Sequence, residues 1–222
     1  MSSNFIKTVF FDFDGVLSKD YFYTNLKDAY PEVYRFIQET VFGKQSKMPD
    51  KWMRGELTSN EVNRFISINT GLDFTKLSKL FIESVKAMRI EKPLVDLAVS
   101  LKDNLFQTAL ITNNMDVFDK ITKHRHQLDS TFPVIVNSFN YGVLKHEENG
   151  KLFDIAMYKL KIRDYKNALL IDNSAKARKM FEQKGGSTFA YTDYPSFKKW
   201  ADKKWCQVYF PQETKKCRQE IK

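Results

Sequence analysis

Two aspartates, Asp12 and Asp14, directly follow the apolar run TVFF at residues 8–11 and are separated by a single residue. Every second side chain of an extended strand points to the same side, so we expect both carboxylates to face one way, with Phe13 opposite. Gly15 then permits a tight turn. One carboxylate of such a pair can act as a nucleophile, and the other, kept protonated by the nearby negative charge, can act as a general acid.

Other polar side chains follow later apolar runs of the chain. They are Thr112 and Asn113 after TALI, Lys145 after a turn that contains Gly142, and Asp172 after ALLI. The carboxyl ends of parallel strands meet at one edge of a sheet, where open sheets of this type bind ligands. We therefore expect these groups to lie near Asp12 and Asp14 and to form one site.

Five short apolar runs indicate the strands that would position these groups. They cover residues 8–13, 107–111, 134–136, 168–171 and 187–191. The first run is apolar on both alternating faces, as expected of a strand covered by helices on both sides. Most neighbouring runs are separated by enough residues for a helix, which favours parallel strands. The sequence therefore predicts an α/β fold with a Rossmann-like, five-stranded parallel sheet.

About 90 residues separate the first two runs, which is too many for one crossover helix and indicates an inserted domain. The insertion is predicted to be mostly helical, because apolar residues recur at helical spacing over residues 26–41, 59–69 and 74–88. Thr58 or Ser59 can cap the middle helix. We assign residues 18–91 to a helical cap domain and residues 1–17 with 92–222 to the core.

Hydrophobic residues make up 42% of the 222 residues and charged residues 28%, which excludes a disordered chain and a fibrous repeat. Two cysteines cannot build a disulfide framework or a four-cysteine zinc site. No signal peptide and no membrane span is apparent, so we expect a cytoplasmic protein without membrane association.

The net charge of +9 is concentrated at the C-terminal end, where residues 198–222 carry eight Lys or Arg and three Asp or Glu. Aromatic residues are interspersed among these lysines. This pattern is more typical of an amphipathic segment packed on its own domain than of a nucleic-acid-binding surface. We expect no nucleic-acid partner, and a monomer or weak dimer.

The motifs, taken in order, resemble those of the haloacid dehalogenase (HAD) superfamily, and the resemblance spans nearly the whole chain. They are FFDFDGVL at 10–17, LITNN at 110–114, Lys145, and LLIDNS at 169–174. The first motif is the most specific, and the ordered set with a helical insertion is much stronger than any one motif. The segment WMRGELTSNEVNRFI at 52–66 resembles the helical cap of the branch with sugar-phosphate phosphatases and beta-phosphoglucomutase.

The resemblance implies a phosphatase that acts on a small phosphorylated metabolite, such as a sugar phosphate. Asp12 would form an aspartyl-phosphate, while Asp14 would protonate the leaving group and then activate water. Mg²⁺ would be bound by Asp12, Asp172 and the backbone carbonyl of Asp14, in keeping with its preference for a few carboxylates and waters.

The remaining site residues would neutralise or hold the phosphoryl group. Thr112, with backbone donors near Asn113, would bind the phosphoryl oxygens. Lys145, together with the metal, would offset the negative charge of two carboxylates and a phosphate dianion. Asn173 departs from the commoner second acidic residue of the last motif, and would weaken the metal site or orient a bound water.

Substrate selection is expected to reside in the cap. Trp52 and Arg54 are candidates for contacts with the substrate, although a structural tryptophan and a salt-bridged arginine fit the sequence equally well. A phosphomutase of the beta-phosphoglucomutase type shares all the core residues and stays an alternative. So does a non-catalytic binding protein on the same fold. Asp14 argues against a dehalogenase, which needs no general acid at that position.

Overall fold

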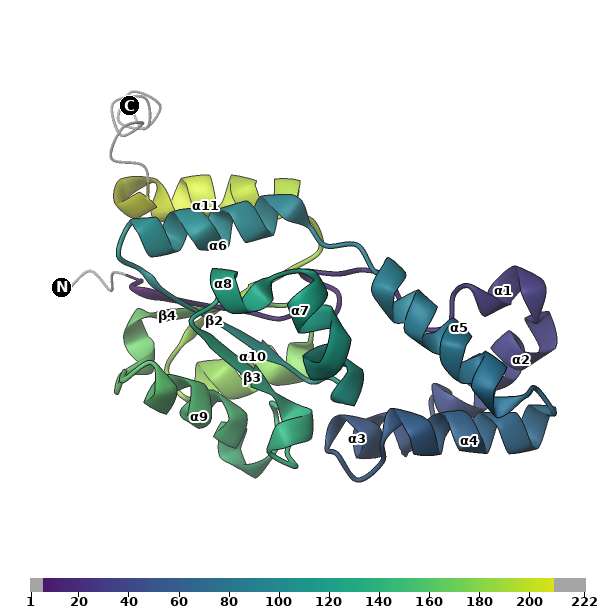
Figure 1. Ribbon diagram of the computed structural model, residues 1–222. Helices are drawn as coiled ribbons and strands as arrows, with labels where there is room; N and C mark the ends of the chain where they lie inside the picture. The colour runs from purple at the N-terminus through teal and green to yellow at the C-terminus, as the bar shows by residue number, and fades with distance from the viewer. Residues whose placement is uncertain (1–5, 210–222) are drawn as a thin grey trace.

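The computed structural model describes residues 6–209 of the chain. Five parallel strands form one sheet in the order β3-β2-β1-β4-β5 (Figure 1). Their bounds are β1 Thr8–Phe11, β2 Gln107–Thr112, β3 Val134–Asn137, β4 Ala168–Asp172 and β5 Ser187–Ala190. Strand β1 is central, because Thr8 pairs with Gln107 on one side and with Ala168 on the other. The predicted α/β fold with a five-stranded parallel sheet is confirmed.

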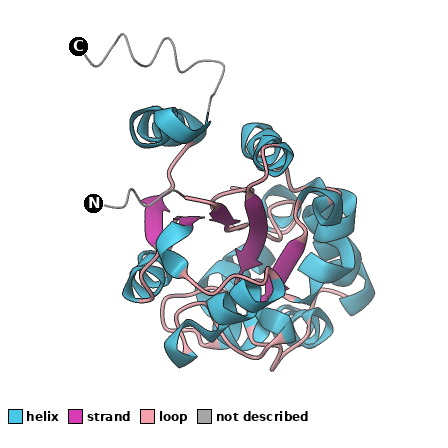
Figure 2. Cartoon of the chain, turned by 90° about the vertical axis from the view of Figure 1, so that its left-hand side faces the viewer, coloured by secondary structure: helices cyan, strands magenta, loops and turns pink. Residues whose placement is uncertain are grey.

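Helices cover both faces of the sheet (Figures 1 and 2). One face is covered by α6 (Lys92–Asp103), α8 (Leu128–Thr131) and α11 (Tyr194–Tyr209), and the other by α9 (Lys151–Lys159) and α10 (Ala175–Gln183). Within β1, Val9 and Phe11 pack toward the first group of helices, whereas Phe10 packs toward the second. All three side chains are completely buried, which explains why this strand has no polar face.

A second group of helices lies beyond one end of the sheet (Figure 1). It consists of α1 (Leu26–Ala29), α2 (Pro31–Phe36), a π-helical turn (Ile37–Val41), α3 (Met48–Met53), α4 (Ser59–Thr70) and α5 (Phe74–Ala87). These elements share a hydrophobic cluster centred on side chains such as Trp52, Ile66 and Phe81. Met115 and Val117 of the core join this cluster, so the helical unit packs directly on the core.

The helix predicted over residues 26–41 is divided in the structure. Tyr30 adopts φ −144° and ψ 64° between α1 and α2. Pro31 follows it, and a residue before proline is disfavoured in the helical region, so the break has a local cause. Helix α4 begins as predicted, because the Thr58 side chain accepts a hydrogen bond from the Glu61 amide and Glu61 bonds back to the Thr58 amide.

Two chain segments connect the helical unit to the core and lie side by side. The Glu91 amide donates to the Leu17 carbonyl over 2.7 Å. Arg89 donates to Asp20 through its backbone amide, Nε and Nη2, at 2.8, 3.1 and 2.9 Å. The chain therefore leaves and re-enters the core at one place, next to the carboxyl end of β1.

After β2 the chain runs through a π-helical turn (Phe118–Thr122) and the short helix α7 (Lys123–Arg125) before α8. No helix within the described part of the chain is both long enough and apolar enough to span a bilayer. The basic segment expected over residues 198–222 is described only as far as Tyr209, where α11 ends, and the rest of it lies outside the described residues.

Candidate active site

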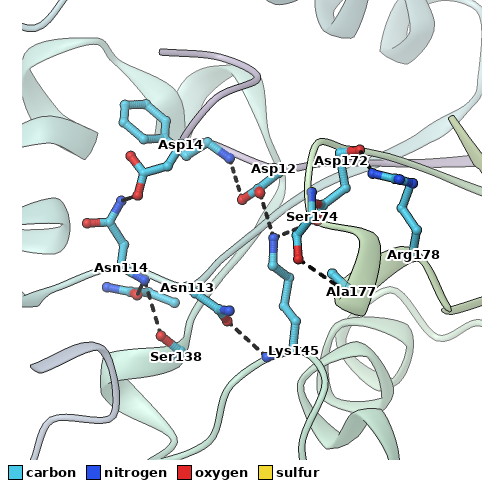
Figure 3. A network of polar contacts seen from close by, with 12 residues as sticks. Asp12, Asp14, Asn113, Asn114, Ser138, Lys145, Asp172, Ser174, Ala177 and Arg178 are labelled. Carbon is cyan, nitrogen blue, oxygen red and sulfur yellow. Dashed lines mark hydrogen bonds and ion pairs between the residues drawn. The ribbon is translucent and has the colours of Figure 1, made fainter. Parts of the chain in front are cut away.

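The Lys145 ammonium joins two carboxylates at the carboxyl ends of β1 and β4 (Figure 3). Its Nζ lies 2.7 Å from Asp12 Oδ2 and 2.6 Å from Asp172 Oδ2. All three residues are buried, with exposed fractions of 5% or less. Three residues that are far apart in sequence, and that were expected to meet at one edge of the sheet, therefore form one ion-paired cluster.

The loop after β1 fixes the orientation of Asp12. The Asp12 amide still bonds to the Ile171 carbonyl of β4 at 3.0 Å, while the Phe13 amide donates to Asp12 Oδ1 at 2.7 Å. The chain then turns at Gly15, whose φ is +78°. A Cβ at this position would lie 2.0 Å from Asn173 Nδ2, so another residue would strain the backbone and would also displace the Asn173 side chain.

The segment after β4 holds Asp172 in a similar way. The Ser174 amide donates to Asp172 Oδ1 at 2.7 Å, and the Arg178 Nη1 donates to the Asp172 carbonyl at 3.0 Å. Ser174 then caps α10. Asn173 does not take part in these bonds, and its side chain lies against Gly15 instead. It thus sits between the two loops that carry Asp12 and Asp172.

Asp14 is separate from the lysine cluster and is held by Asn114. The Asn114 Nδ2 donates to Asp14 Oδ2 at 3.0 Å, and Asn114 itself is buried. Burial raises the pKa of Asp14 to about 7, against the opposing effects of Lys145 and of the hydrogen bond from Asn114. A carboxyl group with this pKa can be present in both its acid and its base form near neutral pH.

Burial and the attraction between opposite charges shift the pKa values of the lysine cluster in opposite directions. Burial, and then the neighbouring Asp172 carboxylate, raise the pKa of Asp12 well above its usual range, although Lys145 opposes this. Burial alone would lower the pKa of Lys145, but the two carboxylates outweigh it and the pKa is raised. The lysine is therefore held in its charged form between two acids that repel each other.

Thr112 and Asn113 lie at the carboxyl end of β2, as predicted. The Thr112 hydroxyl is completely buried and has no hydrogen-bond partner within the described residues, so it is free to bond a group that the chain itself does not supply. The Asn113 side chain is already engaged, because its Oδ1 accepts the Lys145 amide at 2.9 Å. Asn113 thus positions Lys145.

Asn114 and Ser138 are site residues that the sequence did not single out. The Asn114 amide donates to the Asn137 side chain and to Ser138 Oγ, both at 3.2 Å, and Ser138 Oγ donates to the Met53 carbonyl at 2.6 Å. A chain of hydrogen bonds therefore runs from the end of α3 to Asp14. The second asparagine of the TNN sequence was the available signal, but only the fold brings Ser138 beside it.

A cavity of about 280 Å³ opens beside Asp14. Asp14 and Gly15 contribute to its wall, together with residues of both connecting segments and of the π-helical turn at Ile37–Val41. The cavity lies between the core and the helical unit, so a group bound there would be covered from both sides.

Trp52 and Arg54, the predicted substrate contacts, do not line this cavity. Trp52 is completely buried, and its Nε1 donates to Asp116 Oδ1 at 3.0 Å. Arg54 is bound to Glu147 through both Nη2 and Nε, the latter at 2.9 Å from Glu147 Oε2. Both residues instead join the helical unit to core loops. The indole of Trp52 bonds to the buried Asp116 carboxylate, and the guanidinium of Arg54 bonds to the half-buried Glu147 carboxylate.

The buried carboxylates could also hold a cation. No group of three or more His, Cys, Asp or Glu side chains converges on one point among the residues that the structure describes. Side chains of these four types therefore do not form a metal cage by themselves within the described residues. Asp12 and Asp172, which repel each other across Lys145, fit a hard cation that keeps several of its waters.

Comparison with known proteins identifies the fold. No family model and no curated protein matches the sequence. Among solved structures, a predicted HAD-like family hydrolase from Porphyromonas gingivalis superimposes with a TM-score of 0.67 at 18% identity, covering 88% of this chain and 97% of that one. This chain has the fold of the HAD-like hydrolases.

Two other structures with the HAD fold differ in what they are described to do or bind. A HAD family enzyme from Bacteroides thetaiotaomicron, in complex with magnesium and inorganic phosphate, matches with a TM-score of 0.63 at 19% identity over 86% of this chain and 98% of that one. An L-2-haloacid dehalogenase from Xanthobacter autotrophicus matches with a TM-score of 0.59 at 15% identity over 82% and 76%. The HAD fold therefore leaves the reaction to be argued from the site.

Proposed function

We propose that this chain is a magnesium-dependent phosphatase that hydrolyses a small phosphorylated metabolite through an aspartyl-phosphate on Asp12. One observation carries the proposal, namely that Asp12 and Asp172 share the buried Lys145 while Asp14 faces an adjoining cavity. Anionic nucleophiles attack a phosphate ester only when its charge is offset, and this cluster has a fixed cation at the point of attack.

In the first step, Asp12 attacks the phosphorus atom and the bond from phosphorus to the alcohol oxygen breaks. Asp14 donates its proton to the departing oxygen, so the alcohol leaves neutral. The Lys145 ammonium, which is paired with Asp12, and the unpartnered Thr112 hydroxyl would bind phosphoryl oxygens. The products of this step are the free alcohol, the aspartyl-phosphate and an Asp14 carboxylate.

In the second step, water attacks the same phosphorus atom. Asp14, now ionised, takes a proton from this water, and the bond between phosphorus and the Asp12 oxygen breaks. Inorganic phosphate leaves, Asp12 is again a carboxylate and Asp14 is again protonated. The pair of aspartates therefore returns to its starting state without another reactant.

Magnesium fits the oxygen donors of this site. Asp12, Asp172 and the Asp14 carbonyl are the proposed ligands, with waters or phosphoryl oxygens completing the coordination. When bound, the ion would offset the charge of the transferring phosphoryl group. The Bacteroides enzyme described in complex with magnesium and inorganic phosphate supports this choice.

The helical unit at residues 18–91 is proposed to act as a cap. It contributes Phe22, Gln38 and Phe42 to the cavity beside Asp14, so it would contact the alcohol part of the substrate and exclude water from the phosphoryl group. Residues 1–17 and 92–222 would then form the catalytic core.

Other reactions on this fold are less well supported. A dehalogenase has no need for an acid at Asp14, whereas here a dedicated hydrogen bond from Asn114 orients that carboxyl. A phosphomutase uses the same core residues, so it differs only in the final acceptor, a sugar in place of water. Release of inorganic phosphate in the absence of any added acceptor separates the two.

The direct test is hydrolysis of p-nitrophenyl phosphate by the purified full chain, with and without Mg²⁺. We expect release of phosphate that requires the metal and is lost in Asp12→Asn. Asp96→Asn is a matched control, since this exposed aspartate pairs with Lys92 on α6. Absence of turnover over a broad pH range with Mg²⁺ present would contradict the proposal and favour a binding protein.

A further inference from the structure

The cavity beside Asp14 has walls that are mainly aromatic and thioether. Phe22 and Phe42 contribute from the helical unit, Met88 from the returning connection and Met115 from the core. Both methionines are nearly completely buried, with 4% of their surface exposed. A group that enters this cavity therefore meets apolar surface from two phenyl rings and two thioethers.

The two phenyl rings are held in place from behind by Trp52. The ring centroids of Phe22 and Phe42 lie 6.2 and 6.5 Å from that of Trp52, and the Phe42 and Trp52 planes are inclined by only 23°. Phe22 also makes an edge contact with Phe81 at 5.7 Å. Because Trp52 is itself buried and hydrogen-bonded to Asp116, this wall is formed before any ligand binds.

The polar side chains of the cavity offer few partners to a ligand. Asp20 is already bound by Arg89 through three donors. Lys19, Tyr21 and Gln38 also line the cavity but are exposed, so water competes with a ligand for their polar groups. A sugar that entered this space would lose hydrogen bonds to water at several hydroxyls and regain few of them, which is unfavourable.

An aromatic ring loses few hydrogen bonds to water on entering the cavity and gains apolar contacts there. It would stack on or meet the edges of Phe22 and Phe42, and it would contact the sulfur atoms of Met88 and Met115. The cavity volume of about 280 Å³ is near the lower end of the range for small-molecule sites, so it suits one ring rather than a large ligand.

We infer that this cavity binds the alcohol part of a phosphomonoester in which an aromatic ring lies next to the ester oxygen, in preference to a sugar phosphate. The inference rests on the proposed phosphatase function, because it places the phosphoryl group at Asp12 and the leaving group beside Asp14. It narrows the substrate class within that function.

Benzyl phosphate and glucose 6-phosphate test this preference, because both release a primary alcohol and make similar demands on Asp14. We expect kcat/KM for benzyl phosphate to exceed that for glucose 6-phosphate by at least ~10-fold. This is the gain typical of burying a group as large as a phenyl ring. Equal values, or faster hydrolysis of glucose 6-phosphate, would overturn the inference and leave the phosphatase function standing.

Variants of Phe42 test whether the aromatic residues of the cavity cause the preference for benzyl phosphate. Phe42→Ala should reduce the ratio of the two kcat/KM values by about 10-fold, and Phe42→Leu should reduce it less because it keeps apolar volume. Phe65→Ala is the matched control, since Phe65 packs on Phe36 in the helical unit and does not line the cavity. A ratio that stays unchanged in Phe42→Ala and Phe42→Leu would contradict the assignment.

A binding measurement separates the cavity from the reaction. By titration calorimetry with Mg²⁺, benzylphosphonate, which cannot be hydrolysed, should bind about 10-fold more tightly than methylphosphonate, and Phe42→Ala should remove most of that difference. If this preference is found without turnover of any ester, the phosphatase function fails and the aromatic site stands. If both phosphonates bind equally, the aromatic site is refuted whatever the turnover.

Discussion

Asn114 donates a hydrogen bond from Nδ2 to Asp14 Oδ2 at 3.0 Å and thereby fixes the carboxyl group that faces the cavity. The backbone amide of the same asparagine donates to Ser138 Oγ, and Ser138 Oγ donates to the Met53 carbonyl. The orientation of the proposed acid thus depends on contacts with the helical unit as well as on the core.

Asn114→Ala should therefore impair protonation of the leaving group. Loss of one orienting hydrogen bond, at about 1 to 2 kcal/mol, corresponds to a roughly 5- to 30-fold lower kcat/KM for benzyl phosphate. The loss should be smaller for p-nitrophenyl phosphate, whose leaving group needs no proton. Asn60→Ala, at an exposed position of α4, is the control. Equal losses for the two esters would show that Asn114 only supports the fold.

Asp14→Asn tests the acid itself. The amide cannot donate a carboxyl proton, so first-turnover release of benzyl alcohol should slow much more than first-turnover release of p-nitrophenol. Dephosphorylation also needs Asp14, so the phosphorylated enzyme should accumulate and be detectable by mass spectrometry. The assigned role is wrong if both esters lose rate in parallel and no phosphorylated enzyme is seen.

Asp116 should be important for stability, because it joins the helical unit to the core. Its Oδ1 accepts from Trp52 Nε1 at 3.0 Å and from the Ser59 amide at 3.1 Å, and Lys120 Nζ lies 2.8 Å from Oδ2. Asp116→Ala would leave buried donors unpaired and should lower the free energy of unfolding by about 2 to 4 kcal/mol. Urea denaturation measures this, with Asp129→Ala as an exposed control. An unchanged midpoint would contradict it.

Glu147 should make stability depend on acid pH. Hydrogen bonds from Arg54 lower the pKa of Glu147 from 4.5 to about 2 in the folded chain. A carboxyl whose pKa is lowered by folding stabilises the fold above its unfolded pKa, and this contribution is lost as the pH falls from about 4.5 toward 2. Wild type should therefore lose more stability over this range than Glu147→Gln.

Arg54→Ala extends this prediction to the partner. If Arg54 acts through Glu147, both single variants should show a reduced pH dependence, which is smaller in Glu147→Gln because the Leu144 amide still bonds Glu147 in Arg54→Ala. KM for benzyl phosphate should change little in either. Unfolding curves at several pH values, together with kinetics at neutral pH, make the comparison. A KM that rises only in Arg54→Ala would instead mean that this arginine contacts the substrate.

Much of the fold could be predicted because its signals are local. The apolar runs correspond to the five strands, and the capping box at Thr58 and Glu61 marks the start of α4. The first strand ends earlier than expected, at Phe11, because the Phe13 amide turns to Asp12 Oδ1. This places both aspartates in the loop just beyond the strand.

The site was only partly predictable, because some of its contacts exist only in the folded chain. Lys145 could be selected by its spacing after Gly142, yet nothing local relates Asn114 to Asp14, one hundred residues earlier. Trp52 was equally compatible with a substrate contact and a buried role, since an indole suits both. Its position is decided by the buried Asp116 carboxylate, a long-range partner.

The most direct test of the proposed mechanism is to quench the full chain during turnover of benzyl phosphate with Mg²⁺ and to measure its intact and peptide masses. We predict one added phosphoryl group, located on Asp12 and absent from Asp12→Asn, which should also lose turnover. A phosphoryl group on another residue, or an Asp12→Asn variant that retains more than about a tenth of the wild-type rate, would contradict Asp12 as the nucleophile.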